Sequence, residues 1–336
     1  MEQTIGVLLV LISGIFQGSF ILPMTLMKGW KWENSWLVFS LFGMLILNLL
    51  LAFIFINDLQ GVYEQVDFSD ILILSVFGFC WGLGSVLFGL GMDKLGMSLG
   101  YPVIMGLIAS LGGLIPLFVQ HTSSVFEPAG LMMIAGNIVV VLGIIICSKA
   151  ASQKENTDGQ RTTKTNKLTA GIMIAVAAGV LSCLPNIGFS FGTAITEAAI
   201  QNGTATEMAG NAVWALFFSV GFIPNLAYTL YLIGKNKNTT LFVTPGITKN
   251  VVLGLSMAIM WIGSFYLYGI GSQRMGDWGN IIGWPLFISI SIVVGNLWGV
   301  WRGEWKNANV EAKRKLNIGM LVLILAMALI GISNLF

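Results

Sequence analysis

Two tryptophans in a repeated apolar segment are the side chains best suited to bind a neutral ring-shaped ligand. Trp81 opens the segment WGLGSVLFGLGMDKLG, and Trp261 opens WIGSFYLYGIGSQRMG, in which one Trp, one Leu and three Gly recur in register. Each tryptophan lies about ten residues into its apolar run, roughly 15 Å along a helix and therefore near the middle of a membrane. There an indole ring could pack against the apolar face of a sugar, or it could simply fill space between helices.

Uncharged polar side chains in other apolar runs could bind the hydroxyl groups of such a ligand. Gln17 lies in the first run, and Asn186 and Ser190 lie in the sixth. A proline disturbs each of these two runs, and interrupted spans in corresponding positions indicate a central binding site. Asn211 could line the same site or merely link neighbouring helices.

Charged side chains could couple movement of the ligand to a cation gradient. No ionisable residue occupies the centre of an apolar run, but Glu33 and Glu197 lie near the edges of theirs. A partly desolvated carboxylate could take up a proton near neutral pH, whereas a solvated one would be an ordinary interfacial charge. Arg274 could gate the outer side or pair with Asp277, or it could be a tolerated loop charge.

The composition predicts the elements that hold these residues. Hydrophobic residues make up 56% of the chain and charged residues 10%, so an ordinary soluble domain is excluded. Apolar runs of about 20 residues predict ten transmembrane helices in an all-α polytopic membrane protein. The expected spans lie near residues 4–24, 36–56, 71–92, 98–119, 129–148, 168–191, 210–233, 250–270, 281–301 and 316–335.

A polar stretch at residues 149–167 divides the chain into residues 1–148 and 168–336, with five expected spans in each half. Because five is odd, the second half must enter the membrane with the opposite orientation. The repeated segment therefore predicts two inverted five-helix repeats, an arrangement typical of secondary transporters. In such a protein the glycine-rich third and eighth helices would move during transport, so leucine at Gly89 or Gly269 should block it.

Lysine and arginine predict the orientation of the spans. If the loops alternate between sides, all of the 17 Lys and Arg residues except Arg274 lie on one face. Basic loops remain in the cytoplasm. The 149–167 linker is therefore expected in the cytoplasm and both termini outside.

Several classes of function lack their residues in this sequence. The chain has one histidine, His121, without a zinc-protease motif, and no paired carboxylates within its apolar runs, so we expect no enzyme, metal or cofactor. The net charge of +2 gives no indication of a nucleic-acid partner. The three cysteines lie in apolar runs and are expected to be buried free thiols.

Several motifs resemble the L-rhamnose–proton symporters of the drug/metabolite transporter superfamily. These are KWEN after the first span, WGLGSVLFGLGMDKLGMSLG in the third, IMWIGSFYLYGIG in the eighth, and GWPL and GVWRGEWKNA further on. The resemblance implies a ten-helix protein of the bacterial inner membrane with both termini outside, which takes up a sugar with a cation. The positions that match the family pattern are Glu33, Trp81, Glu197, Trp261, Tyr268, Arg274 and Trp284.

Two departures from the family pattern affect the substrate and the coupled ion. The family has Gln where this chain has Ser264, so L-rhamnose or a related deoxyhexose or hexose is expected. It has an acidic residue where this chain has Asn280, so the coupled ion is a proton or sodium. An exporter of metabolites or drugs from the same superfamily is the alternative, and a homodimer through the fifth and tenth spans is possible.

Together, these arguments give two sets of candidate residues. The substrate-binding set is Gln17, Trp81, Asn186, Ser190, Asn211, Trp214, Trp261, Ser264, Tyr268 and Trp284. The set for cation coupling or gating is Glu33, Glu197, Arg274 and Asp277.

Overall fold

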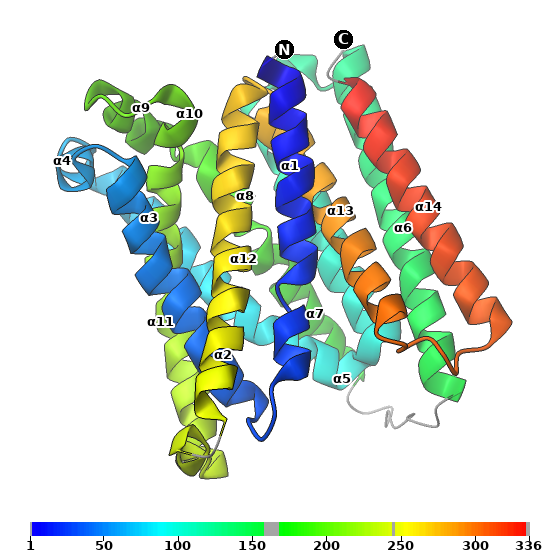
Figure 1. The fold of residues 1–336 in the computed structure, drawn as a ribbon. Helices are drawn as coiled ribbons and strands as arrows, with labels where there is room; N and C mark the ends of the chain where they lie inside the picture. The colour runs from blue at the N-terminus through cyan, green and yellow to red at the C-terminus, as the bar shows by residue number, and fades with distance from the viewer. Residues whose placement is uncertain (1, 158–167, 244–245, 334–336) are drawn as a thin grey trace. The chain divides into compact units, whose positions relative to one another are not determined.

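Every regular element in the part of the chain that the structure describes is a helix (Figure 1). The computed structural model describes residues 2–157, 168–243 and 246–333. Ten segments in it are long and apolar enough to cross a membrane, as the sequence predicted. They are Glu2–Leu26, Trp32–Phe55, Phe68–Met92, Val103–Gln120, Pro128–Lys154, Thr169–Phe191, Thr206–Asn236, Ile247–Arg274, Gly279–Trp301 and Val310–Gly331.

Backbone contacts divide the chain into two compact units. Unit 1 contains Met1–Leu83 and Gly188–Gly276, and unit 2 contains Gly84–Ile187 and Asp277–Phe336. Each unit therefore combines spans from both halves of the sequence.

Unit 1 carries most of the predicted site residues on four spans. The first is α1 (Glu2–Ser19) with the short 3₁₀ helix η1 (Leu22–Leu26), and the second is α2 (Trp32–Ser40), the π-helical turn η2 (Leu41–Ile46) and α3 (Leu47–Phe55). The others are α11 (Asn211–Asn236) and α12 (Ile247–Arg274). Helices α1 and α12 lie side by side (Figure 1).

Glycine permits the close approach of α1 and α12. An added Cβ at Gly6 would lie 2.7 Å from the carbonyl oxygen of Gly271, so even alanine is too large there. Small residues at helix contacts let backbones approach closely within a membrane. The shorter helices of this unit are α4 (Leu59–Glu64), α9 (Thr193–Gln201), α10 (Thr206–Ala209) and η5 (Thr239–Val243).

The two interrupted spans occur where the sequence predicted them. The first span changes from α1 to η1, which has Pro23 at its start. The sixth span is divided into α7 (Leu168–Ser182) and α8 (Leu184–Phe191), and Pro185 is the second residue of α8. Proline has no backbone N–H to donate, so it is tolerated at the first turn of a helix but kinks or breaks a helix when it lies in the interior.

Unit 2 contains α6 (Pro128–Thr157), α13 (Gly279–Trp301) and α14 (Val310–Ser333), with the 3₁₀ turn η3 (Thr122–Ser124). Helices α6 and α14 lie side by side (Figure 1). Helical backbone continues from Phe68 to Gln120 as α5, which covers the third and fourth predicted spans and crosses the unit boundary at Leu83.

The predicted linker is partly helical. Helix α6 continues to Thr157, so residues 149–157 extend the fifth span instead of forming a loop. Residues 158–167 of the linker lie outside the described residues.

Candidate functional site

The repeated tryptophans meet in unit 1. The ring centroids of Trp81, on α5, and Trp261, on α12, are 5.9 Å apart with planes at 21°. Both indoles are buried. Phe218 of α11 lies edge-on to each, with centroid distances of 5.0 and 4.8 Å. The two tryptophans of the repeated sequence segment therefore lie together, and Phe218, which no sequence pattern indicated, lies beside both.

A third tryptophan, Trp214, extends this group. Its ring stacks on Phe218 and on Phe189 of α8, with centroid distances of 5.2 and 4.8 Å. Tyr268 of α12 lies beside the same two rings, Trp214 and Phe189. We call Trp81, Trp214, Trp261, Phe189, Phe218 and Tyr268 the aromatic cluster; all six are buried.

A polar pair adjoins Trp261. The hydroxyl of Ser264 lies 2.9 Å from Gln17 Oε1 and 2.6 Å from the carbonyl oxygen of Trp261, and can donate to either. Gln17 is half-buried on α1 and Ser264 is fully buried on α12. The structure thus brings these two predicted residues into contact.

Asn211 begins α11 and is completely buried, yet its side-chain amide has no partner in the described part of the chain. Neither Oδ1 nor Nδ2 makes a hydrogen bond within the described residues, and the same is true of Trp214 Nε1. An unmade hydrogen bond on a buried polar group costs about 1–3 kcal/mol. Ser190 is also buried, and it directly follows Phe189 on α8.

Two other predicted binding residues lie in unit 2, where backbone carbonyls satisfy them. Asn186 Nδ2 donates to the carbonyl oxygens of Gly112 at 2.7 Å and Asn280 at 2.9 Å. Trp284 Nε1 donates to the carbonyl oxygen of Ile108 at 2.8 Å. These bonds tie α8, α5 and α13 together, which is a structural use of both side chains.

The two candidate carboxylates differ sharply in their surroundings. Glu33 is 6% exposed and is the one buried acidic residue in the described part of the chain. Its Oε1 accepts hydrogen bonds from Asn236 Nδ2, at 2.7 Å, and from Asn238 Nδ2. Glu197, in contrast, is exposed on α9. The two asparagines that donate to Glu33 come 203 and 205 residues later in the chain, so no local sequence pattern connects them with it.

Arg274 pairs with carboxylates of its own unit. Its Nη1 lies 2.7 Å from Glu2 Oε2 and its Nη2 lies 3.3 Å from Glu207 Oε1. The ion pairs join the start of α1, the α10 turn and the end of α12. Neither partner was predicted. Asp277, the partner expected from the sequence, is exposed and belongs to unit 2.

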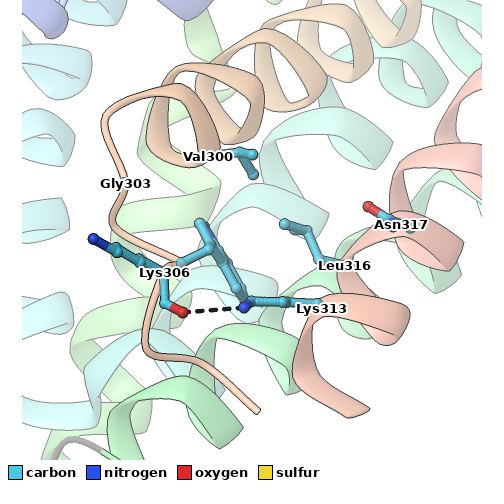
Figure 2. Close-up of a pocket in the computed structure, with 7 residues that line it drawn as sticks. Val300, Gly303, Lys306, Lys313, Leu316 and Asn317 are labelled. Atoms are coloured by element: carbon cyan, nitrogen blue, oxygen red, sulfur yellow. Dashed lines mark hydrogen bonds between the residues drawn. The ribbon is translucent and has the colours of Figure 1, made fainter. Parts of the chain in front are cut away.

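Unit 2 also has a surface pocket where α13 leads into α14 (Figure 2). Within it, Lys313 Nζ donates to the carbonyl oxygen of Lys306 at 3.1 Å. The pocket is lined by Val300, Gly303, Trp305, Lys306, Lys313, Leu316 and Asn317, none of which is a predicted site residue. Two ammonium groups beside apolar walls suit an anion better than a neutral sugar.

These observations define an all-helical, polytopic membrane protein with ten candidate spans and a buried aromatic and amide cluster in one unit. The chain belongs to the L-rhamnose-proton symport protein family (RhaT), whose model matches residues 1–335. The sequence resemblance is thereby confirmed.

Named relatives match over nearly their whole length. The L-rhamnose-proton symporters of Salmonella typhimurium (strain LT2) and Salmonella newport (strain SL254) are each 27% identical over 337 residues, which is 98% of this chain and 98% of theirs. A solved structure, described only as a crystal structure of a protein, matches with a TM-score of 0.54 and 16% identity. It covers 96% of this chain and 95% of its own, and it supports the fold alone.

Proposed function

We propose that this chain imports L-rhamnose, or a closely related deoxyhexose, together with protons across a bacterial inner membrane. The observation that carries the proposal is the family match over residues 1–335. The symporters of Salmonella that align over 98% of the chain support it.

The aromatic cluster and its polar neighbours are the proposed binding region. Ring faces of Trp81 and Trp261 are suited to the apolar face of a sugar, and Gln17 and Ser264 provide uncharged donors and acceptors beside them. A neutral polyol needs no charged partner, which agrees with a cluster that contains none. The contacts of Asn186 and Trp284 instead favour a supporting role for these two residues.

Glu33 is the proposed carrier of the coupled proton. A carboxylate at the edge of a span can change its charge during transport, and Glu33 is buried where such a change has a large electrostatic effect. Its two asparagine donors would hold the charged form, and protonation would weaken both bonds. Sodium is the alternative coupling ion.

The proposed mechanism is alternating access. Residues 1–148 and 168–336 would form inverted repeats with both termini outside, and their rearrangement would expose a central site to each side in turn. Arg274, with its two ion pairs at one end of unit 1, would limit access from the outer side.

Counterflow tests the substrate without requiring an imposed gradient. Liposomes with the purified protein are loaded with unlabelled L-rhamnose and diluted into labelled L-rhamnose. We expect transient accumulation of label, which loading with D-mannose or omission of the protein prevents. If entry of the label does not depend on the loaded sugar, or if no label enters, sugar transport would be contradicted. An exporter of other metabolites would then be favoured.

A further inference from the structure

We infer that Asn211 and Trp214 form the subsite that recognises the hydroxyl groups of the sugar, and that this subsite is closed in the present conformation. The inference rests on the proposed function, which it deepens by assigning recognition to particular atoms. All residues involved belong to unit 1.

Three buried polar atoms at one place have no hydrogen-bond partner among the residues that the structure describes. They are Oδ1 and Nδ2 of Asn211 and Nε1 of Trp214, on the first turn of α11. Both side chains are 0% exposed. Most buried polar side-chain atoms have at least one hydrogen-bond partner, so such a group requires an explanation.

Two of these atoms, Asn211 Oδ1 and Trp214 Nε1, lie next to a glycine. An added Cβ at Gly269 would lie 2.6 Å from Asn211 Oδ1 and 3.0 Å from Trp214 Nε1. It would also lie 3.5 Å from the ring of Phe189. The absence of a side chain at Gly269 therefore leaves the acceptor oxygen of Asn211 and the indole nitrogen of Trp214 close to one point beside an aromatic ring.

This combination matches the chemistry of a sugar. Each hydroxyl of a vicinal diol both donates and accepts a hydrogen bond, so an amide together with an indole N–H can satisfy two neighbouring hydroxyls. Phe189 and Tyr268 provide apolar surface for the methyl group and C–H bonds of a deoxyhexose. None of these side chains is charged, so an ionic substrate would find no oppositely charged partner among them.

Other buried amides in unit 1 have the bonds that Asn211 lacks. Asn48, also 0% exposed, donates from Nδ2 to the carbonyl oxygens of Trp214 at 3.0 Å and Ala215 at 3.3 Å. Its own carbonyl groups accept from the hydroxyl of Tyr266. Full burial in this unit therefore does not by itself prevent hydrogen bonding. Asn211 differs from Asn48 because its amide has no partner among the described residues.

The same distances show why the subsite must open. Since even a methyl group does not fit at Gly269, a sugar can reach these atoms only if α11 and α12 separate locally. Binding would then replace the missing hydrogen bonds.

The test compares sugar affinity with stability. Asn211→Leu and Trp214→Phe remove the unpartnered groups and keep most of the side-chain volume. We expect each to weaken L-rhamnose binding, measured by calorimetry in detergent, about tenfold or more, since one hydrogen bond to a buried polar group is involved. The Tm of Asn211→Leu should equal or exceed that of the wild type, because no existing hydrogen bond is lost. Trp214→Phe also loses ring contacts, so it is compared by affinity alone.

Matched controls are Asn48→Leu and Trp36→Phe, in which a bonded amide and a bonded indole N–H are removed. Each should lower the Tm, and Trp36→Phe, whose indole is bonded to Asn225 and not to the subsite, should leave the affinity of the folded protein near the wild-type value. Unchanged affinity in both test variants, or a fall in the Tm of Asn211→Leu as large as that of Asn48→Leu, would overturn the inference. If the wild type binds no L-rhamnose, the proposed function fails, and the Tm comparison still decides whether the Asn211 amide is unpartnered.

Discussion

Leucine at Gly269 is expected to abolish L-rhamnose uptake, whereas leucine at Gly89 should leave it largely intact. The repeat places these two glycines at equivalent positions, and the sequence alone predicted equal sensitivity. Their surroundings differ, because an added Cβ at Gly269 meets Asn211 and Trp214, while one at Gly89 meets no described heavy atom within 4 Å. A side chain at Gly269 would occupy the space through which the proposed subsite receives a hydroxyl group.

The measurement is counterflow with membrane-inserted protein, and Gly269→Ala serves as the smaller probe. Overpacking a well-packed interior by a methyl group costs about 1–3 kcal/mol, which a folded protein of this size should tolerate in Gly269→Ala. Size-exclusion profiles would confirm that each variant is folded. Wild-type exchange in Gly269→Leu, or equal loss in Gly89→Leu, would contradict the predicted difference.

Replacement of Glu33 by glutamine is expected to abolish proton-driven accumulation but to preserve exchange. Glutamine keeps an acceptor oxygen for Asn236 and Asn238, so the local contacts survive. It cannot bind and release a proton at physiological pH. Sugar would therefore still cross the membrane and equilibrate, without concentration inside.

The matched control is Glu197→Gln, the same chemical change at an exposed carboxylate. Both variants are assayed for counterflow and for uptake driven by an inward proton gradient. Accumulation by Glu197→Gln but not by Glu33→Gln supports the assignment. Full accumulation by Glu33→Gln would show that Glu33 is not the proton carrier. Loss of both counterflow and accumulation in Glu33→Gln would indicate a structural role.

Much of the fold could be predicted because hydropathy acts locally. Ten runs of sufficient length appear directly in the sequence, and Pro23 and Pro185 indicate the interrupted spans for a steric reason that is also local. Continuation of α6 through residues 149–157 was missed because polar residues at a span end are compatible with either helix or loop. The π-helical turn at Leu41–Ile46 left no recognisable pattern.

The candidate site was predictable only where the sequence repeats. The duplication identified Trp81 and Trp261, which stack in unit 1. Asn186 and Asn211 could not be told apart, since both are amides in apolar runs. The structure separates them by their partners, as Asn186 donates to distant carbonyls and Asn211 to none of the described groups. Such partners depend on tertiary contacts that composition does not encode.

Coupled import is tested by measuring uptake of labelled L-rhamnose into proteoliposomes under an imposed gradient. For one proton per sugar, a gradient of about one pH unit is worth roughly 1.4 kcal/mol and should support about tenfold accumulation. We predict accumulation that follows the inward proton gradient and disappears with a protonophore. Accumulation driven by sodium alone, or no accumulation under either gradient, would contradict proton-coupled L-rhamnose import.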